Sequence, residues 1–368
     1  MTLSKNLSTP SSSTDLSLVN LLDVVEDETD SQMLAAPDDP ESELCRMLSV
    51  GSFTPDGASS SAEPRVDDPL EEYRKIGAGA CGVVFSLVGT PLAFKVAKAG
   101  YHADLWNDAN MHTTIREAFN RFSRRDAQAF KIPQFYGYVP AEEAGFFSKH
   151  PNLVRAAAEE CQTPSHVLLS ERIWPLPLPI RQQLIGKYCH PRIQEIAHSD
   201  PANKDCLVRL YLGSLRGRVN GNFFSLRNFK LHLNQMVDLG LDVEVIAHKM
   251  GSALAIMHWA ARTDGRDVEF VLGSSVKKTI APQPLPSEDG HKQPCHYVGP
   301  PTFALEDFQT RTTELWILDF NQVQRISLDD AGVAQAVNAV KINDPYFPRP
   351  HGKSVVERRN NKRERVCG

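Results

Sequence analysis

The residues best suited to chemistry lie in two neighbouring stretches. The glycines of Ile76-Gly77-Ala78-Gly79-Ala80-Cys81-Gly82 follow the spacing G-x-G-x-x-G and are followed at once by Val-Val-Phe. Glycine permits positive φ and lets N–H groups approach an anion, because no Cβ intervenes. The strand pattern Ala93-Phe94-Lys95-Val96 comes next, and alternation places Ala93 and Lys95 on one face. These residues predict a phosphate site in which Gly77, Gly79 and Gly82 form the cradle and Lys95 supplies the charge.

A carboxylate that positions this lysine is expected on the next element. Leu105 to Phe122 is predicted to be a helix, because Ile115, Ala118 and Phe122 fall on one stripe. Glu117 on this helix is the expected partner of Lys95. A solvated surface glutamate is the alternative reading of Glu117.

A second set of acidic residues has the spacing of a phosphoryl-transfer loop. Such a loop needs an aspartate that accepts a proton and, five residues on, a metal ligand followed by an apolar strand. Asp264 fits this register, with Glu269 at the ligand position and residues 270–272 as the strand. Choosing Asp267 as the aspartate instead would put Leu272 at the ligand position, so that register is rejected. Glutamate is a hard oxygen ligand that can hold magnesium, but it adds a negative charge beside the phosphates.

Two further residues complete the predicted site. The apolar run from Leu315 ends in Asp319-Phe320-Asn321, a pattern that presents a magnesium ligand, and a turn former at a strand end is the alternative for Asp319. Glu171 lies near the end of a predicted strand, His166 to Ile173, and the backbone of this end would hydrogen-bond a nucleotide base.

Composition indicates a globular protein whose first 66 residues are strongly acidic. Apolar residues make up 41% and charged residues 23% of 368, with a net charge of −5. Residues 1–66 carry 12 acidic and 3 basic side chains. No apolar run approaches a membrane span. The seven cysteines form no C-x-x-C pair and lack zinc-site spacing, which predicts reduced thiols in the cytoplasm or nucleus and no zinc.

The chain divides at changes in composition. Residues 1–66 are predicted to be a disordered acidic arm rich in Ser and Pro. Residues 67–174 read as a β-rich lobe and residues 175–350 as a mainly helical lobe, with the proline run 175–179 as the boundary. Residues 274–313 are predicted to be a surface insertion and residues 351–368 a basic tail.

Many longer stretches resemble a fungal domain family of unknown function, often labelled "zinc finger protein"-like. The matching segments run from Ile76 to Pro350 and include Leu105-Trp-Asn-Asp108, Asp267-Val-Glu-Phe-Val-Leu-Gly273 and Leu318-Asp-Phe-Asn321. No function is established for that family, so the resemblance implies none. Its members continue past residue 346 with a Trp- and Phe-containing helix, which the basic tail replaces here.

Separately, the chain is similar to the protein-kinase-like fold, which implies an α+β, two-lobed architecture. The expected function is a kinase-like domain that binds ATP and magnesium and transfers phosphoryl groups. Asp264 would be the base, and Asp319 with Glu269 would hold the metal. The alternative is a catalytically inactive kinase-like module that binds a protein partner. Neither hypothesis involves a membrane or a nucleic acid.

Overall fold

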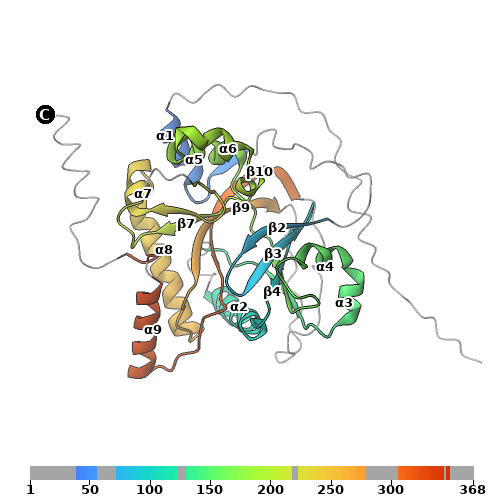
Figure 1. Cartoon of the computed structure of the whole chain (residues 1–368). Helices are drawn as coiled ribbons and strands as arrows, with labels where there is room; N and C mark the ends of the chain where they lie inside the picture. The colour runs from blue at the N-terminus through green and yellow to red at the C-terminus, as the bar shows by residue number, and fades with distance from the viewer. Residues whose placement is uncertain are drawn as a thin grey trace, which may run out of the picture.

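The computed structural model describes residues 39–55, 72–122, 130–217, 223–278, 306–343 and 345–348. Two five-stranded sheets lie at its centre, with helices packed around them (Figure 1). The α+β class predicted from the sequence is therefore confirmed.

The first sheet has the strand order β2-β3-β4-β6-β5, and all neighbours are antiparallel. Its strands are β2 (Tyr73–Ala78), β3 (Gly82–Leu87), β4 (Leu92–Ala97), β5 (Phe135–Val139) and β6 (Val167–Glu171). Leu92, Phe94 and Val96 pack on the side of α3 (Ala144–Lys149) and α4 (Pro151–Ala157). Ala97 packs against α2 (His102–Phe122), so Lys95 lies on the α2 face, as the alternation predicts.

The second sheet has the order β1-β10-β9-β7-β8. Its strands are β1 (Phe53–Pro55), β7 (Val208–Tyr211), β8 (Phe229–His232), β9 (Glu269–Lys278) and β10 (Glu306–Leu318). Only the β7–β8 pair is parallel among the described strands. The register of the β9–β10 pair places Glu269 opposite Leu318 and therefore next to Asp319.

Two predictions about the second lobe need correction here. Residues 175–350, predicted to be mainly helical, also contain the strands β7, β8, β9 and β10 of the second sheet. The predicted insertion 274–313 begins and ends within paired strands, since β9 runs to Lys278 and β10 starts at Glu306. Residues 279–305 lie outside the described part of the chain.

Helices cover the second sheet and fill the rest of the core. They are α5 (Leu178–Tyr188), α6 (Gln194–Ser199), α7 (Leu233–Leu239), α8 (Val243–Ala255) and α9 (Asp330–Ile342), with 3-10 turns at Pro191–Ile193 and Pro201–Lys204. Gly240 takes φ +78° and caps α7, which separates it from α8. A π-turn at Ile256–Ala260 then ends α8.

The predicted disordered arm contains core structure. Helix α1 (Pro40–Leu48) buries Leu44, Met47 and Leu48 at 1–2% exposure, and β1 pairs with β10. The boundary at residue 66 is therefore wrong for residues 39–55. The three apolar side chains recur at helical spacing, and the Asp39 side chain caps the helix by accepting from Glu41 N. Residues 1–38 of the arm and the tail 351–368 lie outside the described residues.

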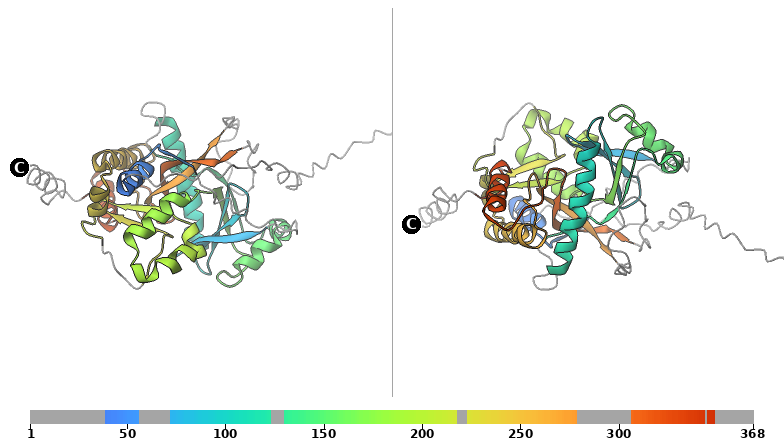
Figure 2. Two further views of the ribbon diagram at one scale, coloured as in Figure 1. Left: turned by 90° about the horizontal axis from the view of Figure 1, so that it is seen from above. Right: turned by 90° about the horizontal axis from the view of Figure 1, so that it is seen from below.

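Helix α2 runs along the boundary between the two sheets (Figure 2). It contacts β5 and β6 of the first sheet on one side and the π-turn after α8 on the other. The backbone of Lys131, just before β5, also contacts β10. Its N–H donates to Leu315 O at 2.8 Å, and its carbonyl accepts from Ile317 N at 2.9 Å. Within the described residues, no helix is both long and apolar enough to cross a membrane.

Candidate functional site

Lys95 is the centre of the candidate site, which lies between the two sheets. Its side chain is 15% exposed, and its ammonium donates to Asp108 Oδ2 at 2.6 Å and to Asp319 Oδ1 at 2.8 Å. Burial by itself would lower the pKa of the lysine, but the two carboxylates together raise that pKa well above its ordinary value. The cation is therefore fixed in its charged form between two elements.

Asp108 supplies the helix carboxylate. It is buried in α2, and its second oxygen accepts from Phe320 N at 3.1 Å. The neighbouring Asn107 donates to the carbonyls of Asn321, at 2.8 Å, and Val323, at 2.9 Å. Helix α2 thus holds both the lysine and the segment that begins at Asp319.

The structure gives Lys95 a different helix partner from the predicted Glu117. Glu117 is exposed, and it lies about 13 Å further along the helix axis than Asp108 at 1.5 Å per residue. The signal that could have identified Asp108 is a buried stripe of Leu105, Ala109 and His112, on which Asp108 also falls. A charged residue on an apolar stripe requires a partner, and Lys95 is that partner.

The glycine stretch forms the hairpin between β2 and β3, and Gly82 of this stretch lies next to the Lys95 side chain. Gly79 N donates to Gly82 O at 2.9 Å. A Cβ at Gly82 would lie 2.8 Å from Val96 O, so only glycine fits there, whereas a Cβ at Gly79 would meet no atom within 4 Å and one at Gly77 only Val84 at 3.8 Å. Cys81 is buried in the hairpin and interacts with Lys95, and burial raises the pKa of its thiol.

Glu171 occupies the end of β6, where the sequence predicts contact with a base. Its N–H donates to Gln134 O at 2.7 Å, and its carboxylate accepts from Gln134 N at 3.0 Å. The next N–H, of Arg172, donates to Pro91 O at 2.8 Å. Neither of these two N–H groups is therefore available to a base.

Asp264, the predicted base, is held by the chain itself. It is 2% exposed, and its Oδ1 accepts from Arg266 N at 3.0 Å and from Gln324 N at 2.9 Å. Its Oδ2 accepts from Gln335 Nε2 at 3.0 Å. Both carboxylate oxygens of Asp264 therefore accept hydrogen bonds from the chain, which hold the loop in place.

Asp267 reaches the site that Asp264 does not. It interacts electrostatically with Asp319 and Lys95, and its side chain accepts from Gln322 Nε2. Burial raises the pKa of the Asp267 carboxyl, and the charge of Asp319 raises it further. The aspartate of the register rejected in the sequence analysis thus interacts with Lys95 and Asp319.

Glu269, the predicted second metal ligand, lies beside Asp319 but forms an ion pair with a side chain of the protein. Arg209 on β7 donates to Glu269 Oε1 at 2.7 Å. Burial raises the pKa of Glu269 to about 7, although Arg209 opposes that rise. The extra negative charge that glutamate brings is thus offset by a residue that sequence spacing did not indicate.

Backbone strain is concentrated in the same segments. Asp319 has φ +66°, Asp267 has φ +61° and Arg262 has φ +53°, values that residues with a side chain rarely adopt; among the described residues Asn228, before β8, is the fourth, with φ +59°. Such conformations cost on the order of 1–3 kcal/mol each and persist where the surrounding structure imposes them, often at functional sites. Asp319, which pairs with Lys95, and Asp267, which interacts with both of them, are two of these four residues.

Comparisons with known proteins add one local similarity. Residues 315–362, which include Asp319 and α9, match a family model described as "Zinc finger protein". No curated protein matches the chain. In the part of the chain that the structure describes, no group of three or more His, Cys, Asp or Glu side chains is arranged to hold a metal ion, and Cys45, Cys81, Cys161, Cys189 and Cys206 are free thiols.

Proposed function

We propose that the chain binds a nucleoside triphosphate with magnesium between its two sheets, in a kinase-like manner. The observation that carries the proposal is the placement of Lys95, with one carboxylate from α2 and a second at the end of β10. In protein kinases a strand lysine pairs with a helix acid and holds the phosphates under a glycine loop, while an aspartate after a strand holds magnesium. Here Asp108 takes the place of the helix glutamate.

The residues present fit a magnesium nucleotide. Magnesium is bound by one or two carboxylates together with phosphate oxygens and does not need a complete protein cage. Asp319 is 27% exposed, and its Oδ2 has no hydrogen bond to the described residues, so this oxygen would hold the metal. The metal, when bound, would neutralise charge on the phosphates. Gly77 and Gly79 leave space for those phosphates beside Lys95.

A catalytically inactive nucleotide-binding module is the second candidate. Two observations favour it: both oxygens of Asp264 accept hydrogen bonds from the chain, and Glu269 is paired with Arg209. If the protein does transfer phosphoryl groups, we propose Asp267 as the proton acceptor, because it interacts electrostatically with Lys95 and Asp319. Activity then depends on Asp267, whereas nucleotide binding depends on Lys95 and Asp319.

A melting experiment tests the nucleotide proposal. A ligand at a hundred times its dissociation constant stabilises the fold by about 2.7 kcal/mol. We expect ATP with magnesium to raise the melting temperature by several degrees. Asp319→Asn should remove the dependence on magnesium, and Lys95→Met should remove the shift, each judged against the same variant without ligand.

The outcomes separate the candidates. Absence of a shift with millimolar ATP, GTP or ADP would exclude nucleotide binding and leave a protein-interaction module. A shift that survives in Lys95→Met would place the nucleotide elsewhere. If binding is found, ATP turnover that is lost in Asp267→Asn but kept in Asp264→Asn would show an active enzyme, whereas no turnover in the wild type supports the inactive module.

A further inference from the structure

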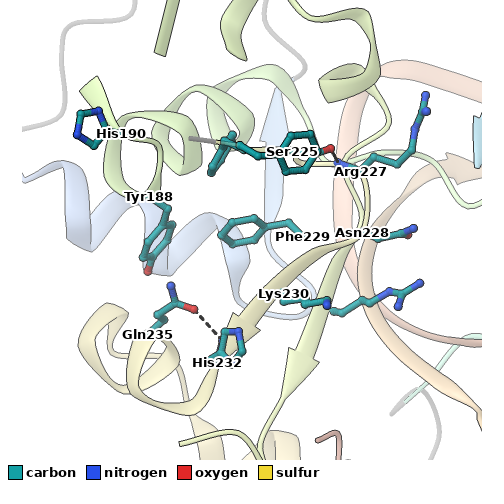
Figure 3. Close-up of a pocket in the computed structure, with 12 residues that line it drawn as sticks. Tyr188, His190, Ser225, Arg227, Asn228, Phe229, Lys230, His232 and Gln235 are labelled. Carbon is teal, nitrogen blue, oxygen red and sulfur yellow. Dashed lines mark hydrogen bonds between the residues drawn. The ribbon is translucent and has the colours of Figure 1, made fainter. Parts of the chain in front are cut away.

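A pocket lies at the edge of the second sheet, beside β8 (Figure 3). Its volume is about 500 Å³. We call it the basic–aromatic pocket after six of its lining residues: Tyr188, Arg209, Phe223, Arg227, Phe229 and Lys230. It is assembled from the end of α5, the segment before β8, and strands β7 and β8.

Positive charge gathers in this pocket. The parallel register of β7 and β8 places Arg209 opposite Lys230, so both side chains leave the same face of the sheet. Arg227 lies on the same side of the pocket as Lys230 in Figure 3. No aspartate or glutamate occurs among the described residues that line it. Cations brought together in this way repel one another unless an anion lies between them.

The neighbouring carboxylates offset this charge only in part. Asp205 is shared by two guanidinium groups, those of Arg74 and Arg227, each at 2.9 Å. Glu269 pairs with Arg209. Lys230 has no ion pair within the described part of the chain, and its ammonium lies 5.9 Å from the ring of Tyr211. The pocket thus keeps an excess of positive charge.

Two buried polar atoms on the cationic side of the pocket have no hydrogen-bond partner among the described residues: Arg209 Nε and Arg227 Nε. Buried polar groups are nearly always hydrogen-bonded in folded proteins. Both can donate, and a phosphate offers several acceptor oxygens to donors of this kind. The orphaned donors therefore indicate an oxyanion as the missing partner.

The aromatic lining lies on the other side of β8, because Phe229 and Lys230 are consecutive residues of this strand and point to opposite faces. The Phe229 ring lies 5.6 Å from Tyr188 and 5.8 Å from Phe224, and in Figure 3 it stands between Tyr188 and the cationic side. Phe223 at the margin is 85% exposed. Aromatic walls with a few convergent polar groups are typical of small-molecule sites and suit a flat apolar body.

We propose that the basic–aromatic pocket binds a small phosphate monoester with a flat apolar body, such as an aryl phosphate. The phosphate lies among Lys230, Arg227 and Arg209, and the body lies against the exposed ring of Phe223 at the margin of the pocket. This site is separate from the proposed nucleotide site, although Arg209 and Glu269 connect the two. It does not depend on nucleotide binding.

Calorimetric titration of the full chain tests this proposal with 1-naphthyl phosphate, and with 1-naphthol and inorganic phosphate as its two halves. We expect the ester to bind at least tenfold more tightly than either half. Lys230→Met and Phe223→Ser should each weaken binding tenfold or more without lowering the melting temperature, because both side chains are exposed. Lys341→Met, which removes an exposed charge on α9, is the matched control and should change nothing.

Two results would overturn the proposal: no binding of the ester at millimolar concentration, or equal binding by wild type and Lys230→Met. Displacement of the ester by excess ATP, together with loss of ester binding in Lys95→Met, would assign the ester to the nucleotide site and also overturn it. Ester binding in a chain that shows no ATP-induced shift would support this pocket while contradicting the proposed nucleotide function.

Discussion

At the scale of single residues, Lys95 neutralises two carboxylates, of which Asp108 is almost fully buried. Removing one partner of a buried ion pair costs about 3–5 kcal/mol, because a buried charge is left uncompensated. We expect Lys95→Met to lower the free energy of unfolding by roughly 3 kcal/mol. Urea denaturation measures this change.

The control for Lys95 is Lys98, whose ammonium donates to Gly79 O at the surface. Lys98→Met should cost less than about 1 kcal/mol. Adding Asp108→Asn to Lys95→Met should restore part of the lost stability, since the amide oxygen can still accept from Phe320 N. Equal stability of Lys95→Met and wild type would contradict the pairing.

Glu269 predicts a dependence of stability on pH. Its carboxyl has a pKa of about 7 in the folded protein against an ordinary value of 4.5. The folded state therefore keeps a proton that the unfolded chain has lost. The stability that Glu269 contributes is complete below about pH 4.5 and is lost as the pH rises through 7, at up to about 1.4 kcal/mol per pH unit.

Glu269→Gln resembles the protonated form and should not show this loss. We expect the stability of wild type relative to this variant to fall between pH 5 and 7, by about 3 kcal/mol at most. Denaturant titrations at several pH values measure the difference, in which the contributions of shared groups such as His112 cancel. A difference that stays constant with pH would show that Glu269 is already ionised at pH 5.

The sequence predicted some residues of the candidate site and missed others. Lys95, Asp319 and the glycine hairpin follow from spacing within one or two strands, which alternation and turn chemistry determine locally. Asp108 and Asp267 do not, because their roles depend on where α2 lies and on a loop with positive φ at Asp267. Arg209 joins the site through β7–β9 pairing, a contact that no local pattern encodes.

At the scale of elements, helix α1 is the clearest case in which composition misled. The acidic, Ser-rich surroundings predicted disorder, yet Leu44, Met47 and Leu48 are buried against the second-sheet core. A short helix of this kind has little stability of its own and folds because it packs. Because hydrophobicity was averaged over 66 residues, the prediction missed one amphipathic helix, α1, and one edge strand, β1.

This burial predicts that the segment cannot be removed. Leu44→Ala and Met47→Ala should each lower the free energy of unfolding by about 2–5 kcal/mol, as large-to-small changes in a core do. The exposed Glu41→Ala is the control and should cost less than about 1 kcal/mol. A chain shortened to begin at residue 67 should melt many degrees lower than one that begins at residue 37, and equal melting temperatures would contradict the packing of α1.

At the scale of the whole molecule, a buried carboxylate ties the glycine hairpin to the second sheet. Asp205, 7% exposed, precedes β7 and accepts from Arg74 on β2 and from Arg227 before β8. Arg227 also donates to Lys75 O on β2 at 3.4 Å. These contacts fix the position of the hairpin relative to Arg209 and Glu269 on the opposite sheet.

We therefore expect Asp205→Asn to loosen the hairpin and to lower the free energy of unfolding by about 2 kcal/mol or more, because two largely buried guanidinium groups lose their counter-charge. Glu160→Gln is the matched control, since Glu160 pairs with the next β2 residue, Lys75, but that pair is exposed and should contribute less than about 1 kcal/mol.

Hydrogen exchange distinguishes loosening of the hairpin from loosening of the whole first sheet. Asp205→Asn should accelerate exchange in β2 and β3 while β5 and β6 keep their protection, because the far side of the first sheet is held to β10 through Lys131. Equal acceleration across all five strands would show that Asp205 supports the whole first sheet and does not act on the hairpin alone.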